Sequence, residues 1–125
     1  MITPGRYDYC GLYLRGLSKD AAVDLVAQAI ATSLDGAVAQ LNGLEIEVLR
    51  NPGFVSDAED FPTWPIKIEV VKQEAAPSQM VDAVSKLLTF AWRAGYEAVA
   101  ACDYEDELPA EGGYVRCSPG GTGVG

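Results

Sequence analysis

Hydrophobic and polar residues alternate along four short stretches of the chain, the pattern of half-buried β-strands. In the first stretch, Cys10, Leu12 and Leu14 point to one side, and Tyr9 and Tyr13 point to the other. The alternation predicts strands over residues 7–15, 44–49, 64–72 and 98–103. The last begins with the apolar run Ala-Val-Ala-Ala-Cys, which indicates a buried strand.

Two other stretches place their apolar residues at helical spacing. Ser18 is the expected N-cap of a helix over 19–34, which ends at Asp35-Gly36. A second helix is expected over 79–94, with Gly95 as its stop. A weaker helical continuation is expected over 37–41.

The order of these elements, β-α-β-β-α-β, predicts an α+β domain with a ferredoxin-like sandwich fold. We expect a four-stranded antiparallel sheet of order 4-1-3-2, with both helices on one face. We also expect the central strands, the first and the third, to run parallel to each other. The helix-covered face should collect the core residues Leu12, Leu14, Ile46, Ile68 and Ala100, and Trp92 should be largely buried.

Chain length fits a single domain, because 125 residues can bury one sizeable core. We expect this domain to span 1–117, with a short edge strand over 113–117. The glycine-rich residues 118–125 have the composition of a flexible tail.

Charge is concentrated in one part of the chain. The net charge is −9, and residues 97–111 hold six carboxylates and no lysine or arginine. Such a segment attracts cationic partners and repels nucleic-acid phosphates and anionic membranes. We therefore expect a basic protein partner, and neither nucleic acid nor a membrane.

Several kinds of chemistry are disfavoured by the composition. The chain has no histidine, the commonest general base and metal ligand near neutral pH. The acidic run from Asp103 to Glu107 lacks the spacing of an EF-hand loop, so we expect no metal and no cofactor. The apolar runs are far shorter than a membrane span, and the first residues lack the basic and apolar regions of a signal peptide, so we expect a cytoplasmic protein.

Two of the cysteines, Cys10 and Cys102, are expected to lie close together in the fold. If the last strand runs antiparallel to the first, Cys10 and Cys102 become close neighbours on the helix-covered face. Buried thiols are usually inert packing residues, which is the expectation here, and a redox pair is the alternative.

A resemblance can be stated from the second half of the chain. Residues 61–69, and then Gly95-Tyr-Glu-Ala-Val-Ala-Ala-Cys-Asp-Tyr-Glu-Asp-Glu-Leu-Pro109, resemble a group of small, acidic, uncharacterised bacterial proteins. These proteins share the ending A-V-A-A-C-D-[FY]-E-[DE]-E-L-P. In size and charge, the chain is also similar to immunity proteins that neutralise bacterial toxins.

These observations favour a non-enzymatic acidic binding protein, an immunity or inhibitor protein for a basic partner. The expected partner-binding residues lie at the exit of the last strand and on the open sheet face: Asp103, Tyr104, Glu105, Asp106, Glu107, Tyr9 and Tyr13. The alternative is a homodimeric module of ferredoxin-like fold that has a ligand-binding or regulatory role. A third hypothesis is a small enzyme that uses Asp103, Glu105 or Cys102.

Overall fold

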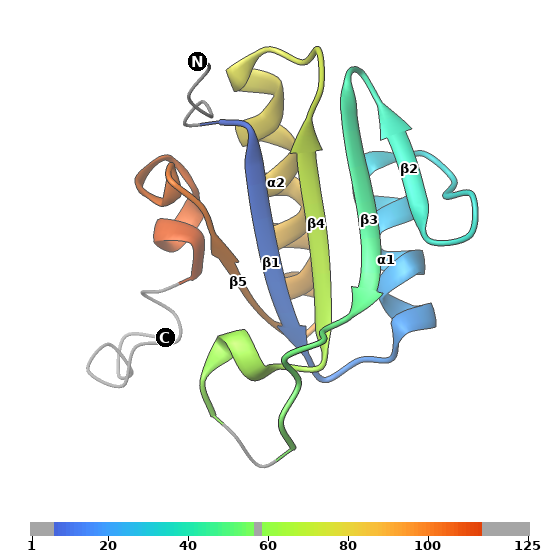
Figure 1. Cartoon of the computed structure of the whole chain (residues 1–125), viewed down its shortest axis with the longest axis vertical. Helices are drawn as coiled ribbons and strands as arrows, with labels where there is room; N and C mark the ends of the chain where they lie inside the picture. The colour runs from blue at the N-terminus through green and yellow to red at the C-terminus, as the bar shows by residue number, and fades with distance from the viewer. Residues whose placement is uncertain (1–6, 57–58, 114–125) are drawn as a thin grey trace.

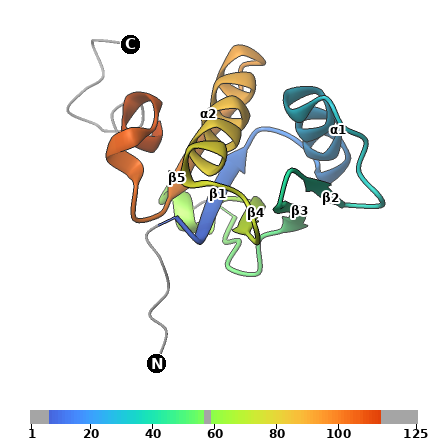
Figure 2. The same cartoon turned by 90° about the horizontal axis from the view of Figure 1, so that it is seen from above.

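A single sheet carries two helices on one of its faces (Figures 1 and 2). The computed structural model of the chain describes residues 7–56 and 59–113. Its strands are β1 (Tyr9–Arg15), β2 (Val38–Leu41), β3 (Leu44–Arg50), β4 (Ile66–Lys72) and β5 (Glu97–Ala101). The helices are α1 (Lys19–Ile30) and α2 (Pro77–Arg93), and short 3-10 turns are η1 (Phe61–Thr63), η2 (Glu105–Glu107) and η3 (Pro109–Gly113).

The sheet has five strands in the order β2-β3-β4-β1-β5, so the prediction of a four-stranded sheet is wrong. The four predicted strands, which are β1, β3, β4 and β5, keep their expected neighbours, and β2 is added at the edge beside β3. The additional strand, β2, replaces the weak helical continuation expected over 37–41. Asn42 and Gly43 both have positive φ, 49° and 81°, which matches the tight turns that join antiparallel strands. The chain therefore reverses into a hairpin, and Leu41 pairs with Leu44.

Neighbouring strands all run antiparallel, including the central pair β1 and β4. The expectation of a parallel central pair is wrong, because the direct connection from β3 to β4 reverses the chain between them. Strand β3 has the direction of β1, but β4 lies between the two.

The helix boundaries follow from capping. Ser18 accepts a hydrogen bond from the Ala21 N–H, as its N-cap position predicts, at 3.1 Å. Helix α1 ends at Ile30, before the expected residue 34, because Ala31 adopts a left-handed conformation and the Thr32 N–H bonds back to Ala27. Helix α2 starts earlier than expected, at Pro77, a favoured first-turn position.

The core fills the space between the helices and the sheet. All five residues expected there, Leu12, Leu14, Ile46, Ile68 and Ala100, are buried. Trp92 is only half-buried, and its indole N–H donates to the Ala98 carbonyl at 3.1 Å. The well-buried tryptophan is instead Trp64, which is 3% exposed.

After β5 the chain turns into the helix layer. In Figure 2, η2 and η3 lie beside α2, above the sheet. This approach is close: a Cβ at Gly113 would lie 2.5 Å from the Ala98 carbonyl oxygen, and φ there is 101°. Glycine at this position therefore lets the segment lie against β5.

Within the described ranges, no helix is long and apolar enough to cross a bilayer. The expected tail, 118–125, lies outside the described residues, as do residues 114–117 of the expected edge strand.

Candidate functional site

The residues expected to bind a partner fall on two opposite sides of the sheet. Tyr9 and Tyr13 alternate with the buried Cys10 and Leu12, which places them on the face without helices. The acidic segment, defined as residues 103–107, lies on the helix side, next to α2 (Figure 2). The structure therefore does not bring the two sets together into one surface.

Within the acidic segment, one residue faces inward. Tyr104 is 0% exposed, and its ring packs 5.2 Å from that of Tyr7 between centroids. It anchors the segment to the core, so its side chain does not belong to a binding surface. Asp103, Asp106 and Glu107 are exposed.

Hydrogen bonds hold two of the acidic side chains in place. Glu105 accepts from the Cys102 N–H at 3.1 Å, and Glu107 accepts from the Tyr7 hydroxyl. Such charge-assisted bonds order the turn that η2 makes. Glu105 and Glu107 thus have structural roles, whereas the side chains of Asp103 and Asp106 lie at the surface.

An open groove of about 410 Å³ separates the acidic segment from the first turns of α2. Asp82 and Glu107 supply carboxylates on its two sides, and Val81 supplies an apolar surface. Its remaining lining residues are Tyr7, Pro77, Ser78 and Ser85. Among the described residues, the lining contains no cationic side chain, so this part of the groove fits an extended, positively charged segment better than an anion.

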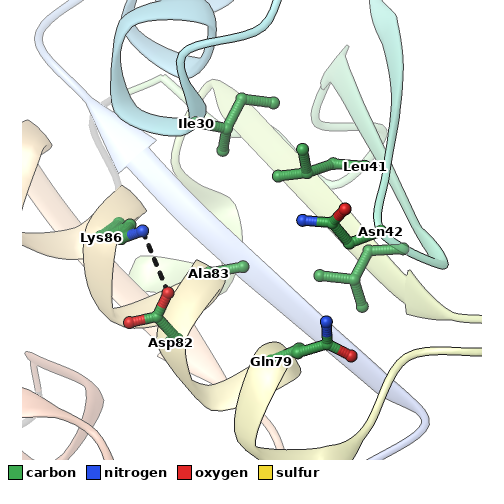
Figure 3. Close-up of a pocket in the computed structure, with 8 residues that line it drawn as sticks. Ile30, Leu41, Asn42, Gln79, Asp82, Ala83 and Lys86 are labelled. Atoms are coloured by element: carbon green, nitrogen blue, oxygen red, sulfur yellow. Dashed lines mark ion pairs between the residues drawn. The ribbon is translucent and has the colours of Figure 1, made fainter.

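A smaller pocket of about 160 Å³ lies on the other side of α2, at the corner with α1 and the β2–β3 hairpin (Figure 3). Ile30 and Leu41 line it opposite the Asp82–Lys86 ion pair, in which the charged atoms are 3.1 Å apart. Its volume is below that of most small-molecule sites, which start near 300 Å³.

On the open sheet face, Lys67 lies between two tyrosine rings. Its ammonium nitrogen is 5.9 Å from the ring centroid of Tyr9 and 5.4 Å from that of Tyr13. Glu69 completes the network with an ion pair to Lys67 and a hydrogen bond from the Tyr9 hydroxyl. Burial lowers the pKa of Lys67, but its bonds to Tyr9 and Glu69 outweigh burial and leave that pKa raised.

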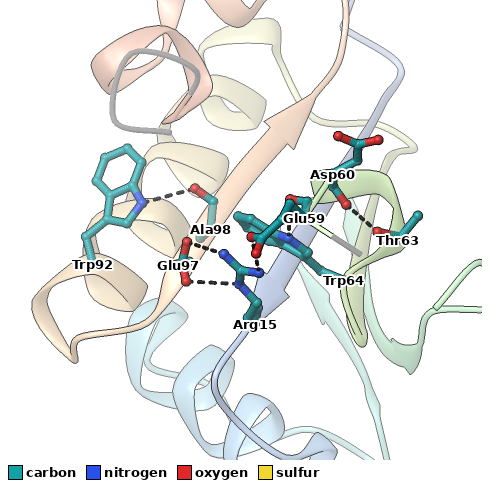
Figure 4. Close-up of polar contacts among 8 residues, drawn as sticks. All are labelled: Arg15, Glu59, Asp60, Thr63, Trp64, Trp92, Glu97 and Ala98. Carbon is teal, nitrogen blue, oxygen red and sulfur yellow. Dashed lines mark hydrogen bonds and ion pairs between the residues drawn. The ribbon is translucent and has the colours of Figure 1, made fainter. Parts of the chain in front are cut away.

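A polar cluster that the sequence did not indicate centres on Arg15, at the end of β1 (Figure 4). Its guanidinium binds both carboxylate oxygens of Glu97, at 2.9 and 2.8 Å, and contacts Glu59 at 3.3 Å. The indole N–H of Trp64 donates to the Glu59 carbonyl at 3.1 Å. The cluster joins β1, β5 and the loop after β3, and no sequence spacing links residues so far apart.

The two cysteines lie in different environments. Cys10 is buried, as expected, whereas Cys102 is only partly buried and packs against the edge of the core. A hydrogen bond to Cys102, together with burial, raises the pKa of the Cys10 thiol. The same bond lowers the pKa of Cys102. Cys117 lies outside the described residues.

Within residues 7–56 and 59–113, no three histidine, cysteine, aspartate or glutamate side chains gather in a way that could hold a metal ion.

Comparison of the chain with family models, with curated proteins and with solved structures finds no match.

Proposed function

We propose that this protein is a non-enzymatic binding protein of the immunity or inhibitor type, which captures a basic protein partner in the cytoplasm. The partner would contact the exposed carboxylates of the acidic segment, Asp103 and Asp106, and place a cationic stretch in the adjoining groove. The observation that carries the proposal is this groove, because carboxylates of Asp82, which also pairs with Lys86, and of Glu107 line it, and the other described lining residues are uncharged.

Electrostatics supports this arrangement. In β5 and the described turns after it, every charged side chain is negative: Glu97, Asp103, Glu105, Asp106, Glu107 and Glu111. Concentrated charge speeds the encounter with an oppositely charged partner and disfavours wrong partners. Val81 and Pro77 add apolar surface to the groove, which would give a bound partner contacts beyond charge.

The test uses an arginine-rich peptide as the probe and isothermal titration calorimetry as the measurement. We expect Asp103→Lys with Asp106→Lys to weaken binding about tenfold, because each exposed ion pair contributes up to about 1 kcal/mol. Raising the salt concentration should weaken binding of the wild-type protein in the same direction.

The matched control places the same charge change on another part of the surface. Asp24→Lys with Asp35→Lys alters two exposed residues in and after α1, which lies on the far side of α2 from the acidic segment (Figure 1). Binding by this variant should stay close to that of the wild type. Equal losses in the two variants would mean that the peptide responds to net charge alone, and the proposed site would be wrong.

A homodimer through the open sheet face is a second candidate. Tyr9 and Val71 are directly opposite each other on β1 and β4 and are 42% and 38% exposed. Large apolar side chains at adjacent exposed positions are typical of a contact surface. Light scattering after size exclusion would test it: a wild-type dimer that becomes monomeric in Tyr9→Ala and Val71→Asp supports this candidate, and a wild-type monomer contradicts it.

A further inference from the structure

Cys10 lies in β1, and Cys102 directly follows the last residue of the neighbouring antiparallel strand β5. Gly11 pairs with Ala101 across β1 and β5, so the next pair in the register is Cys10 with Cys102. Side chains at opposite positions have Cβ atoms about 4.5–5.5 Å apart, and a disulfide requires about 3.5–4.5 Å. A small adjustment at the end of β5 therefore brings the sulfurs into bonding range.

The two cysteine residues differ in exposure. Cys102 is partly exposed just after the last residue of β5, where the sheet ladder ends. Cys10 is 0% exposed in the core. A reactive thiol with a resolving thiol behind it has this arrangement, since Cys102 is the residue of the pair with solvent exposure.

The hydroxyl of Tyr104 lies near both cysteines. It is fully buried and makes no hydrogen bond of good geometry within the described part of the chain, although the thiols of Cys10 and Cys102 are close enough to interact with it. Burial raises its pKa, and the charges of the two nearby cysteines raise it further, so the hydroxyl keeps its proton. An unsatisfied buried donor next to two sulfurs gains a partner when one sulfur becomes a thiolate or acquires an oxygen atom.

We propose that Cys102 is a hydroperoxide-reactive thiol that resolves into a disulfide with Cys10. The Cys102 thiolate attacks the terminal oxygen of the hydroperoxide, the O–O bond breaks, and the alkoxide or hydroxide leaves and takes up a proton. Cys102 is thereby oxidised to a sulfenic acid. The Cys10 sulfur then attacks the Cys102 sulfur, the S–O bond breaks, and the Cys10 proton leaves with the hydroxyl group as water.

The surrounding charge selects a neutral oxidant. Glu105 accepts a hydrogen bond from the Cys102 N–H, and its negative charge disfavours the thiolate form of Cys102. An anionic disulfide such as oxidised glutathione is repelled by this segment, whereas hydrogen peroxide is not. The resulting disulfide would tie the start of the acidic segment to β1, an effect that does not depend on which partner the segment binds.

The experiment treats the reduced protein with equimolar hydrogen peroxide and follows intact mass and peptide maps. A Cys117→Ser background removes the remaining cysteine from the analysis. We expect loss of two hydrogens and a peptide that links Cys10 to Cys102. In Cys10→Ser, dimedone should trap a sulfenic acid at Cys102, and in Cys102→Ser the buried Cys10 should stay unmodified.

Tyr104→Phe keeps the ring and removes only the hydroxyl. We expect it to slow sulfenic acid formation about tenfold, because a hydrogen bond to a charged group is lost, while the thermal unfolding curve shows that the variant is folded. The proposal is overturned if peroxide leaves Cys102 reduced, if it yields a sulfinic acid at Cys102 without a disulfide, or if Cys10 reacts as fast in Cys102→Ser as Cys102 does in Cys10→Ser. An unchanged rate in Tyr104→Phe would overturn the role of that hydroxyl.

Discussion

The guanidinium carbon of Arg15 lies 4.7 Å from the ring centroid of Trp64, while two of its nitrogens bind Glu97. One arginine thus connects an aromatic side chain from the loop after β3 with a carboxylate at the start of β5. The planar guanidinium can do both at once, because it stacks with its face and donates with its edge.

Replacing Arg15 with lysine tests this double contact. Arg15→Lys keeps the charge but loses the paired bonds to Glu97 and the stacking on Trp64, so we expect unfolding to become easier by about 1–2 kcal/mol. Urea titration measures the change. Arg50→Lys, at an exposed position at the end of β3, is the control and should change stability by less than about 0.5 kcal/mol. Equal effects would contradict a special role for Arg15.

The two tryptophans should differ in their contribution to stability. Trp64 is buried under the Arg15 cluster, so Trp64→Ala should cost about 3–5 kcal/mol. Trp92→Ala should cost less, since that side chain is only partly buried at the edge of the core. Thermal unfolding of both variants checks the order, and a larger loss for Trp92→Ala would show that the partly exposed ring contributes more than its burial implies.

Gly43 and Gly36 form a matched pair for backbone strain. Both have positive φ, but a Cβ at Gly43 would lie 2.6 Å from the Ala75 nitrogen, whereas one at Gly36 meets nothing within 4 Å. Gly36→Ala should cost about 1 kcal/mol from the backbone conformation alone. Gly43→Ala should cost more, because the clash is with main-chain atoms that cannot move aside. Similar values from chemical denaturation would contradict the close contact.

Stability should decline at alkaline pH through Cys10 and Tyr104. Their pKa values are raised in the folded protein above the ordinary 9.0 and 10.0, so the unfolded chain releases these protons first. The unfolded state then binds fewer protons, and the free energy of unfolding falls by up to about 1.4 kcal/mol per pH unit for each group. Below the ordinary values the contribution of both groups is fully present.

Denaturant titrations between about pH 8 and pH 10 measure this decline. Cys102, whose pKa is lowered, acts in the opposite sense and only below its ordinary value, so its contribution is lost as the pH falls. Cys10→Ala should therefore flatten the alkaline decline. A decline as steep as in the wild type would mean that other groups cause it.

Local patterns predicted much of the fold, and long-range contacts account for what they missed. Alternation located β1 and β4, because a sheet with one covered face imposes a two-residue period. Strand β2 was not predicted, since a four-residue strand has too short a pattern to distinguish from a frayed helix end. The burial of Tyr104 could not be predicted, because it depends on the chain turning back over the helix layer.

The candidate site was predictable only in part for the same reason. The acidic segment is visible as composition, but its separation from Tyr9 and Tyr13 depends on which side of the sheet the chain takes after β5. The neighbouring positions of Cys10 and Cys102 followed from strand order, whereas their unequal exposure depends on where the β5 ladder ends.

The strand order also has a consequence for how the chain acquires its structure during synthesis. Strands β2, β3 and β4 are consecutive and pair in sequence, so they can form a meander as soon as they are made. Strand β1 lies between β4 and β5, so its pairing is complete only after β5 has been synthesised. Ala100, which pairs with β1, is among the last described residues to be made. Contacts between distant residues form slowly, because a long loop must close first. One edge of β1 thus stays unpaired in the nascent chain until β5 is made. We expect a chaperone to bind, and aggregation to begin, at this segment.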